Sequence, residues 1–110
     1  MTTETTQDVL DQVLELIDSA IERVAGDIGA GAEGAEIYLL ALGKLHDVGG
    51  LMLHAGARPM QGREHAGSPL DWLREAETRL DAIDPADRPV GLGPARVELR
   101  WAVDEMATAH

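Results

Sequence analysis

The chain contains no cysteine and no phenylalanine among its 110 residues. Without cysteine it forms no disulfide, carries no thiolate nucleophile and binds no cysteine-ligated zinc or iron–sulfur cluster. Aromatic residues are scarce as well, since the sequence has two tryptophans and one tyrosine. The core must therefore be filled by leucine, valine, isoleucine, alanine and methionine, a composition that suits packed helices better than sheets.

Positive charge is also in short supply. Nine basic residues face twenty acidic ones, which gives a net charge of −11. A field of that sign repels nucleic acids and anionic membranes, so we expect direct binding to neither. The longest purely apolar run, residues 37–42, is far below the roughly 18 residues that a transmembrane helix needs. The polar, acidic start of the chain shows no secretory signal, and the sequence predicts a cytoplasmic protein.

The longest regular pattern covers residues 5–28. Apolar side chains recur there every three or four residues, with carboxylates between them, which is typical of an amphipathic α-helix. About four positions in seven are apolar, so this helix should contact two or more neighbours rather than one coiled-coil partner. The same face offers surplus apolar area for self-association. The interface candidates on it are Leu10, Val13, Ile17 and Ile21.

Three further helices follow from the same periodicity. The four helices are predicted at about 5–26, 33–53, 69–83 and 94–107, with a long loop over 55–67. These elements predict one all-α domain over residues 1–110. We expect a four-helix up-down bundle with two long and two shorter helices.

Local signals mark several of these boundaries. Thr5 with Asp8, and Ser68 with Asp71, have the spacing of N-terminal capping boxes. Four glycines between residues 26 and 34 should end the first helix. The pair Gly49-Gly50 inside the second helix predicts a kink, a close approach of another backbone, or a hinge, and the sequence does not choose among these.

The loop over 55–67 contains three glycines and a proline and shows no periodicity. Loops of this length are uncommon in compact domains unless they bind something or lack order, and both alternatives stay open. The only local excess of basic groups lies here, so the region would attract an anion. Any ligand-binding or catalytic site is expected between the end of the second helix and this loop. Its candidate residues are His46, His54, Arg58, Arg63 and His65.

Known catalytic and metal-binding patterns are missing. His46 and His54 are eight residues apart, about 12 Å along a continuous helix, so they could not share one ion there. No Glu-x-x-His or His-x-x-x-His spacing occurs, and no hydrolase, P-loop or dinucleotide motif is present. We therefore predict no metal and no cofactor. Asp47 and Glu64 are the nearest carboxylates that could orient a histidine.

Five carboxylates on the first helix form one row, because their spacing alternates between three and four residues. The row has two interpretations. It is an ordinary solvated helix face, or it imitates a phosphate backbone and makes the protein an acidic decoy for a nucleic-acid-binding protein. The five residues are Asp8, Asp11, Glu15, Asp18 and Glu22.

Taken together, these patterns favour a small acidic protein that acts by protein–protein interaction or regulation, without catalysis. The expected partner is another protein or a second copy of the chain, as in a homodimer. Trp72 and Trp101 lie beside apolar stripes and are candidates for core or interface anchors. The alternative from another class is a ligand-binding protein or enzyme with its site at the 55–67 loop.

Overall fold

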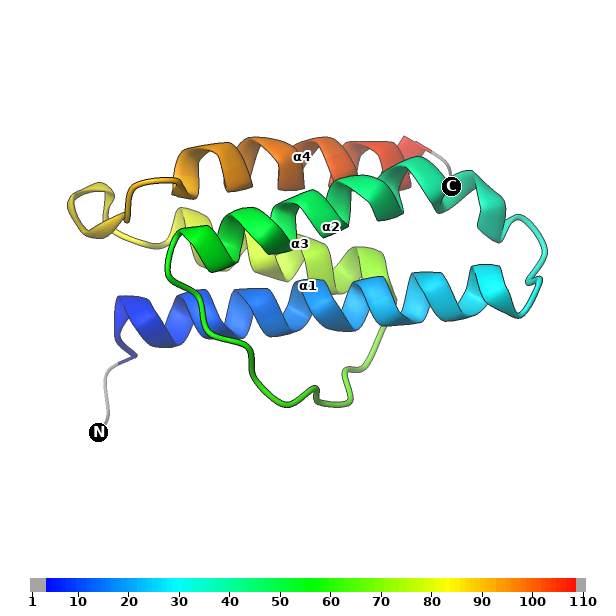
Figure 1. Ribbon diagram of the computed structural model, residues 1–110, viewed down its shortest axis with the longest axis horizontal. Coiled ribbons are helices and arrows are strands. Elements are labelled where there is room, and N and C mark those ends of the chain that lie inside the picture. Colours follow the sequence, from blue (N-terminus) through cyan, green and yellow to red (C-terminus); the bar gives the residue numbers. More distant parts are fainter. Residues whose placement is uncertain (1–3, 109–110) are drawn as a thin grey trace.

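The computed structural model describes residues 4–108, which form α-helices and two short 3-10 helices and contain no strand. The helices surround one hydrophobic core (Figure 1). The prediction of a single-domain, all-α bundle of four helices is confirmed. The elements are α1 (Thr6–Gly29), η1 (Ala35–Tyr38), α2 (Leu39–His54), α3 (Pro69–Asp81), η2 (Pro85–Asp87) and α4 (Leu92–Thr108).

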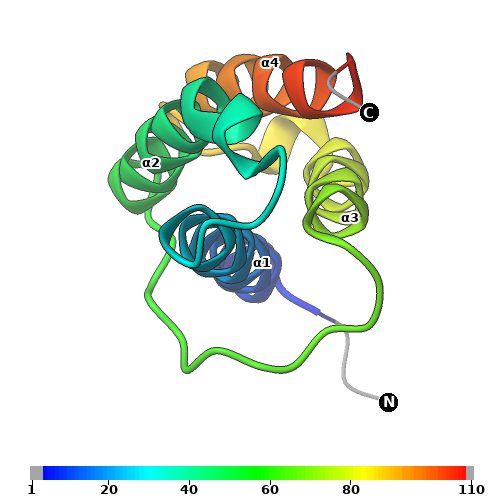
Figure 2. The same ribbon diagram turned by 90° about the vertical axis from the view of Figure 1, so that its right-hand side faces the viewer.

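Seen from one end, the helices form a ring in the order α1, α2, α4, α3 (Figure 2). Packed neighbours run antiparallel. For example, Arg79 near the end of α3 donates to Gln12 near the start of α1. Helix direction does not simply alternate along the chain, because α2 and α3 lie diagonally opposite one another (Figure 2) and run parallel (Figure 1).

This parallel course explains the long connection between α2 and α3. After α2 ends, the chain must return along the bundle before α3 can begin, a distance of about 20 Å for a helix of 13 residues. Bundles with such a crossover need a long connection, whereas alternating bundles need only short ones. We call residues 55–68 the strap. It passes over the outer side of α1, opposite α4 (Figure 2).

The capping boxes form as the sequence predicts. The Thr5 side chain accepts from the Asp8 amide, and the Asp8 carboxylate accepts from the Thr5 amide, both at 3.1 Å. Ser68 and Asp71 make the same reciprocal pair at the start of α3. These side chains satisfy backbone donors that a helix leaves unpaired in its first turn.

The structure decides two predictions about glycines: the first helix does end within the glycine-rich segment 26–34, and one of the alternatives for Gly49-Gly50 applies. The first helix continues past Gly26 to Gly29, because Ile28 still packs against the core. The pair Gly49-Gly50 lies inside α2 and does not break it. Gly49 is buried, and a methyl group there would lie 3.9 Å from the Asp18 carboxylate of α1, so Gly49 marks a close approach of two helices, whereas Gly50 is exposed.

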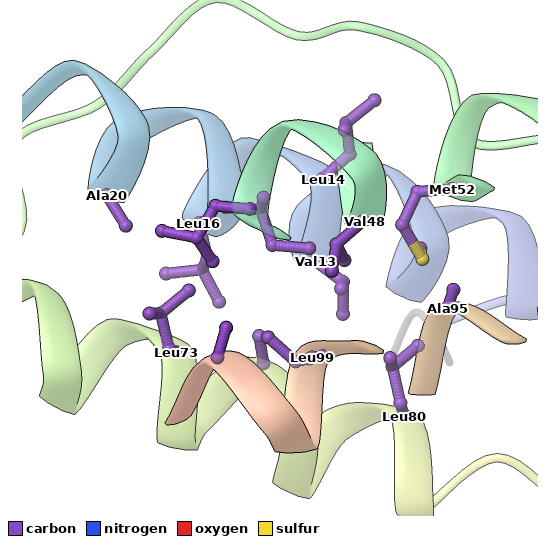
Figure 3. Packing of buried hydrophobic residues seen from close by; sticks show 14 of the residues in the cluster. Val13, Leu14, Leu16, Ala20, Val48, Met52, Leu73, Leu80, Ala95 and Leu99 are labelled. Carbon is purple, nitrogen blue, oxygen red and sulfur yellow. The ribbon is translucent and has the colours of Figure 1, made fainter. Parts of the chain in front are cut away.

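All four helices send aliphatic side chains into the core (Figure 3). Leu10, Val13 and Ile17 are fully buried there, and Ile21 is partly buried against it. The wide apolar face of α1 does contact several neighbours, as predicted, since it packs on both α2 and α3. That packing uses the area that we had assigned to self-association, so the interface prediction for these four residues is corrected to a core role.

Candidate functional site

Two carboxylates of α1 are buried beneath the strap. The exposed fraction of Asp11 is 6% and that of Glu15 is 3%. A buried charge is costly unless it is paired and hydrogen-bonded, so each must be matched by groups of the strap. The interpretation of the acidic row as one solvated face is corrected for these two residues, whereas Asp8, Asp18 and Glu22 are exposed.

Asp11 holds the first part of the strap. Its Oδ1 accepts from the Arg58 backbone amide and from Gln7 Nε2, both at 2.7 Å. Its Oδ2 accepts from Arg58 Nε at 3.2 Å and from Nη2 at 2.9 Å. Burial alone would raise the pKa of Asp11, but the hydrogen bonds from Arg58 and Gln7 outweigh it and lower the pKa below its ordinary value. Asp11 is therefore charged at neutral pH.

Glu15 holds the middle of the strap. Its Oε1 accepts from the Arg63 backbone amide at 3.0 Å, and His65 Nε2 lies 2.7 Å from both carboxylate oxygens. Ser19 Oγ donates to Oε2 at 3.3 Å. The His65 side chain is only 20% exposed, so it shields the carboxylate from water. One buried carboxylate thus fixes two positions of the strap.

Trp72 provides the third attachment. Its indole Nε1 donates to the carbonyl of Ala66 at 2.8 Å, and its ring centroid lies 5.5 Å from that of His65. The side chain is buried, so the structure places this predicted anchor between core and strap and leaves little of it for a partner. The three attachments fix the path of a segment without regular secondary structure.

A cleft of about 300 Å³ opens beside the strap, between α1 and α3. Leu16 of α1, Met60 and Arg63 of the strap and Arg79 of α3 contribute to its lining. At residue 63 the strap is held by the backbone amide, which donates to Glu15. The Arg63 guanidinium makes no hydrogen bond or ion pair within residues 4–108. A free cationic side chain therefore borders an open space.

The structure brings together three of the five predicted ligand-binding residues. Arg58, Arg63 and His65 follow one another along the outer side of α1. His46 and His54 are exposed on α2 and make none of the strap contacts. Sequence reasoning missed that Asp11 and Glu15 of α1 are the partners of these strap residues. The available signal was two acids one helical turn apart and a loop rich in cations, but nothing indicated which helix the loop would cross.

Residues 4–108 contain no group of three or more histidine, aspartate or glutamate side chains that could hold a metal ion. In the same part of the chain, none of the helices is both long and apolar enough to cross a membrane. Asp47 and Glu64 were the carboxylates predicted to be able to orient a histidine. In the structure, His65 is instead held by Glu15.

A second candidate site is an apolar surface along α2 and α4. Leu40 and Val97 are 68% and 69% exposed, and Trp101 is 40% exposed. Lys44 Nζ lies 5.2 Å from the centroid of the Trp101 ring and 2.9 Å from the Glu98 carboxylate, whose hydrogen bond raises the pKa of Lys44. We call Leu40, Lys44, Val97 and Trp101 the α2–α4 face.

No protein-family model, curated protein or solved structure matches the chain. The structure itself offers two candidate functional sites. The cleft beside the strap gathers charged groups around a small space, and the α2–α4 face exposes apolar side chains on an acidic protein.

Proposed function

We propose that the protein acts by binding rather than by catalysis, and that it docks on a second copy of itself through the α2–α4 face. The observation that carries this proposal is the exposure of three large apolar side chains on two packed helices: Trp101 and, one turn earlier on α4, Val97, with Leu40 one turn before Lys44 on α2. Contiguous apolar patches on soluble proteins mark interaction sites, and tryptophan is enriched among residues that dominate binding energy.

The tryptophan is held in position before any partner arrives. Lys44 lies over its ring and is itself fixed by Glu98 on α4. A cation over an exposed aromatic ring contributes about 0.5–1 kcal/mol. An ordered side chain loses less conformational entropy on binding than a free one, so this arrangement supports a docking role for Trp101.

Charge limits where a second copy could dock. Two chains that each carry −11 repel one another over most of their surfaces, so contact is favoured where charge is balanced. On the α2–α4 face, the charge of Lys44 is matched by Glu98. In a two-fold dimer the same patch meets itself, which lets the tryptophan of one copy pack on the leucine and valine of the other.

The test is the mass in solution, measured by sedimentation over a dilution series with matched variants. Val97→Ser removes apolar area from the face, and Val90→Ser makes the same change at a valine that is 94% exposed on the α3–α4 connection. The wild type and Val90→Ser should dimerise alike. Val97→Ser changes both copies in each dimer and removes about 1–2 kcal/mol of apolar burial. It should therefore raise the dissociation constant of the dimer about tenfold.

Salt provides an independent arm of the same experiment. Because two acidic copies repel one another, added salt should strengthen the dimer by screening that repulsion. A wild-type protein that stays monomeric at all concentrations and salt levels would refute the proposal. Equal dimerisation of Val97→Ser and Val90→Ser would show that the copies meet elsewhere.

A further inference from the structure

The cleft beside the strap has the size of a small-molecule site. Its volume of about 300 Å³ lies at the lower end of the range for ligand pockets, roughly 300–1,000 Å³. Three separate elements form its walls: Gln12 and Leu16 come from α1, Met60 and Arg63 from the strap, and Arg79 from α3. A ligand there would contact segments that are far apart in the sequence.

Two arginines from different elements line this cleft. The Arg63 guanidinium has no protein partner within the described part of the chain, and its backbone amide alone holds the strap. Arg79 donates to Gln12, and its guanidinium lies 3.4 Å from the Glu75 carboxylate and 3.8 Å from the Glu4 carboxylate. Both glutamate side chains are at least half exposed, so water competes for these ion pairs. Planar guanidinium groups bind carboxylates through paired hydrogen bonds.

The remaining lining narrows the class of ligand. Met60 is 36% exposed and Leu16 borders the cleft with the small part of its surface that is not buried, so a short hydrocarbon group would find apolar contacts mainly at Met60. Three carboxylates also line the cleft, those of Glu15, Glu64 and Glu75, and their negative charges oppose a dianion more than a monoanion. The arrangement therefore disfavours phosphate and favours a singly charged ligand with an apolar end.

We propose that this cleft binds a small monocarboxylate, with Arg63 holding the carboxylate, Arg79 supporting it from α3, and Leu16 and Met60 contacting the hydrocarbon. The site is independent of the proposed dimer contact, because the strap and the α2–α4 face lie on different sides of the bundle (Figure 2). The two proposals therefore succeed or fail separately.

The test is a titration of the isotope-labelled 110-residue chain by NMR, with acetate, butyrate and inorganic phosphate as probes. Butyrate should shift the amide signals of strap residues 60–65 and the Nε signal of Arg63. A ligand with so few atoms should bind with a Kd on the order of millimolar. Acetate should bind more weakly than butyrate, and phosphate more weakly still.

Arg63→Gln tests the assignment without breaking the strap, because the attachment to Glu15 uses the backbone amide. Butyrate binding should weaken at least tenfold in this variant. The control is Arg74→Gln, which removes an exposed arginine of α3 outside the cleft lining and should leave binding unchanged. Protection of the residue 63 amide from hydrogen exchange verifies that the strap of the variant stays in place.

Three results would overturn the proposal. The first is the absence of any shift with butyrate up to roughly 50 mM, well above the expected millimolar Kd. The second is phosphate binding as tight as butyrate binding, which would indicate nonselective attraction of anions. The third is unchanged butyrate binding in Arg63→Gln.

Discussion

Removing the Glu15 carboxylate should free the middle of the strap. In Glu15→Ala, the Arg63 amide and the His65 ring lose a charged acceptor, and Ser19 loses a weaker one. Hydrogen bonds to charged groups contribute about 1.5–3 kcal/mol each, and water near the strap compensates for part of the loss. We therefore expect a destabilisation of about 2–4 kcal/mol, which lowers the Tm of a domain of this size by about 8–16 °C.

The matched control is Glu22→Ala. It makes the same substitution two turns further along α1, at an exposed side chain that forms no hydrogen bond or ion pair within residues 4–108. Its free energy of unfolding should stay within about 0.5 kcal/mol of the wild type. The difference between the two variants isolates the attachment of the strap from any general effect of losing a carboxylate on this helix.

Two measurements check this prediction. Urea unfolding gives the free-energy difference, and hydrogen exchange at the Arg63 amide reports whether the strap itself opens. In Glu15→Ala, that amide should exchange at least about tenfold faster, since 1.4 kcal/mol corresponds to a factor of ten. If Glu15→Ala and Glu22→Ala unfold alike and leave the Arg63 amide equally protected, the reasoning about the buried carboxylate is refuted.

Two further predictions concern the strap. Asp11→Asn should cost about 1–3 kcal/mol at pH 7. Because the folded-state pKa of Asp11 lies below its ordinary 3.8, this difference should shrink as the pH falls below 3.8 toward that lowered pKa, and a difference in urea unfolding that stays constant as the solution is acidified would contradict it. Gly67→Ala should cost about 1–2 kcal/mol more than Gly62→Ala, since Gly67 has φ +91° and a methyl group there would lie 2.8 Å from Asp71. Equal Tm values for both variants would argue against this strain.

The helices could be predicted because their signals are local. The capping pairs Thr5 with Asp8, and Ser68 with Asp71, act within one turn, and each helix begins where they indicate. The periodicity of α1 also identified Val13 and Ile17 as members of an apolar face. Which neighbour covers such a face depends on the whole arrangement, and for this reason core and self-association interface were confused.

The path of the strap could not be predicted, because it follows from the diagonal placement of α2 and α3. Asp8 and Asp11 look equivalent in a row of carboxylates, yet only Asp11 is covered. Periodicity indicates the face of a helix on which a residue lies and leaves open what crosses that face. Composition drew attention to this loop, but it could not show that the side chains of Arg58 and His65 pair with carboxylates of α1.

The crossover also bears on how long the molecule stays folded. Its two attachments to α1 join residues 47 to 50 positions apart, so we expect them to form late in folding, because closing such a long loop costs entropy. Contacts that form after the folding transition state slow unfolding and leave the folding rate nearly unchanged. In stopped-flow experiments, Glu15→Ala should therefore unfold faster and fold at the wild-type rate. The strap would then mainly lengthen the lifetime of the native state, because its contacts form after the folding transition state and must break before unfolding.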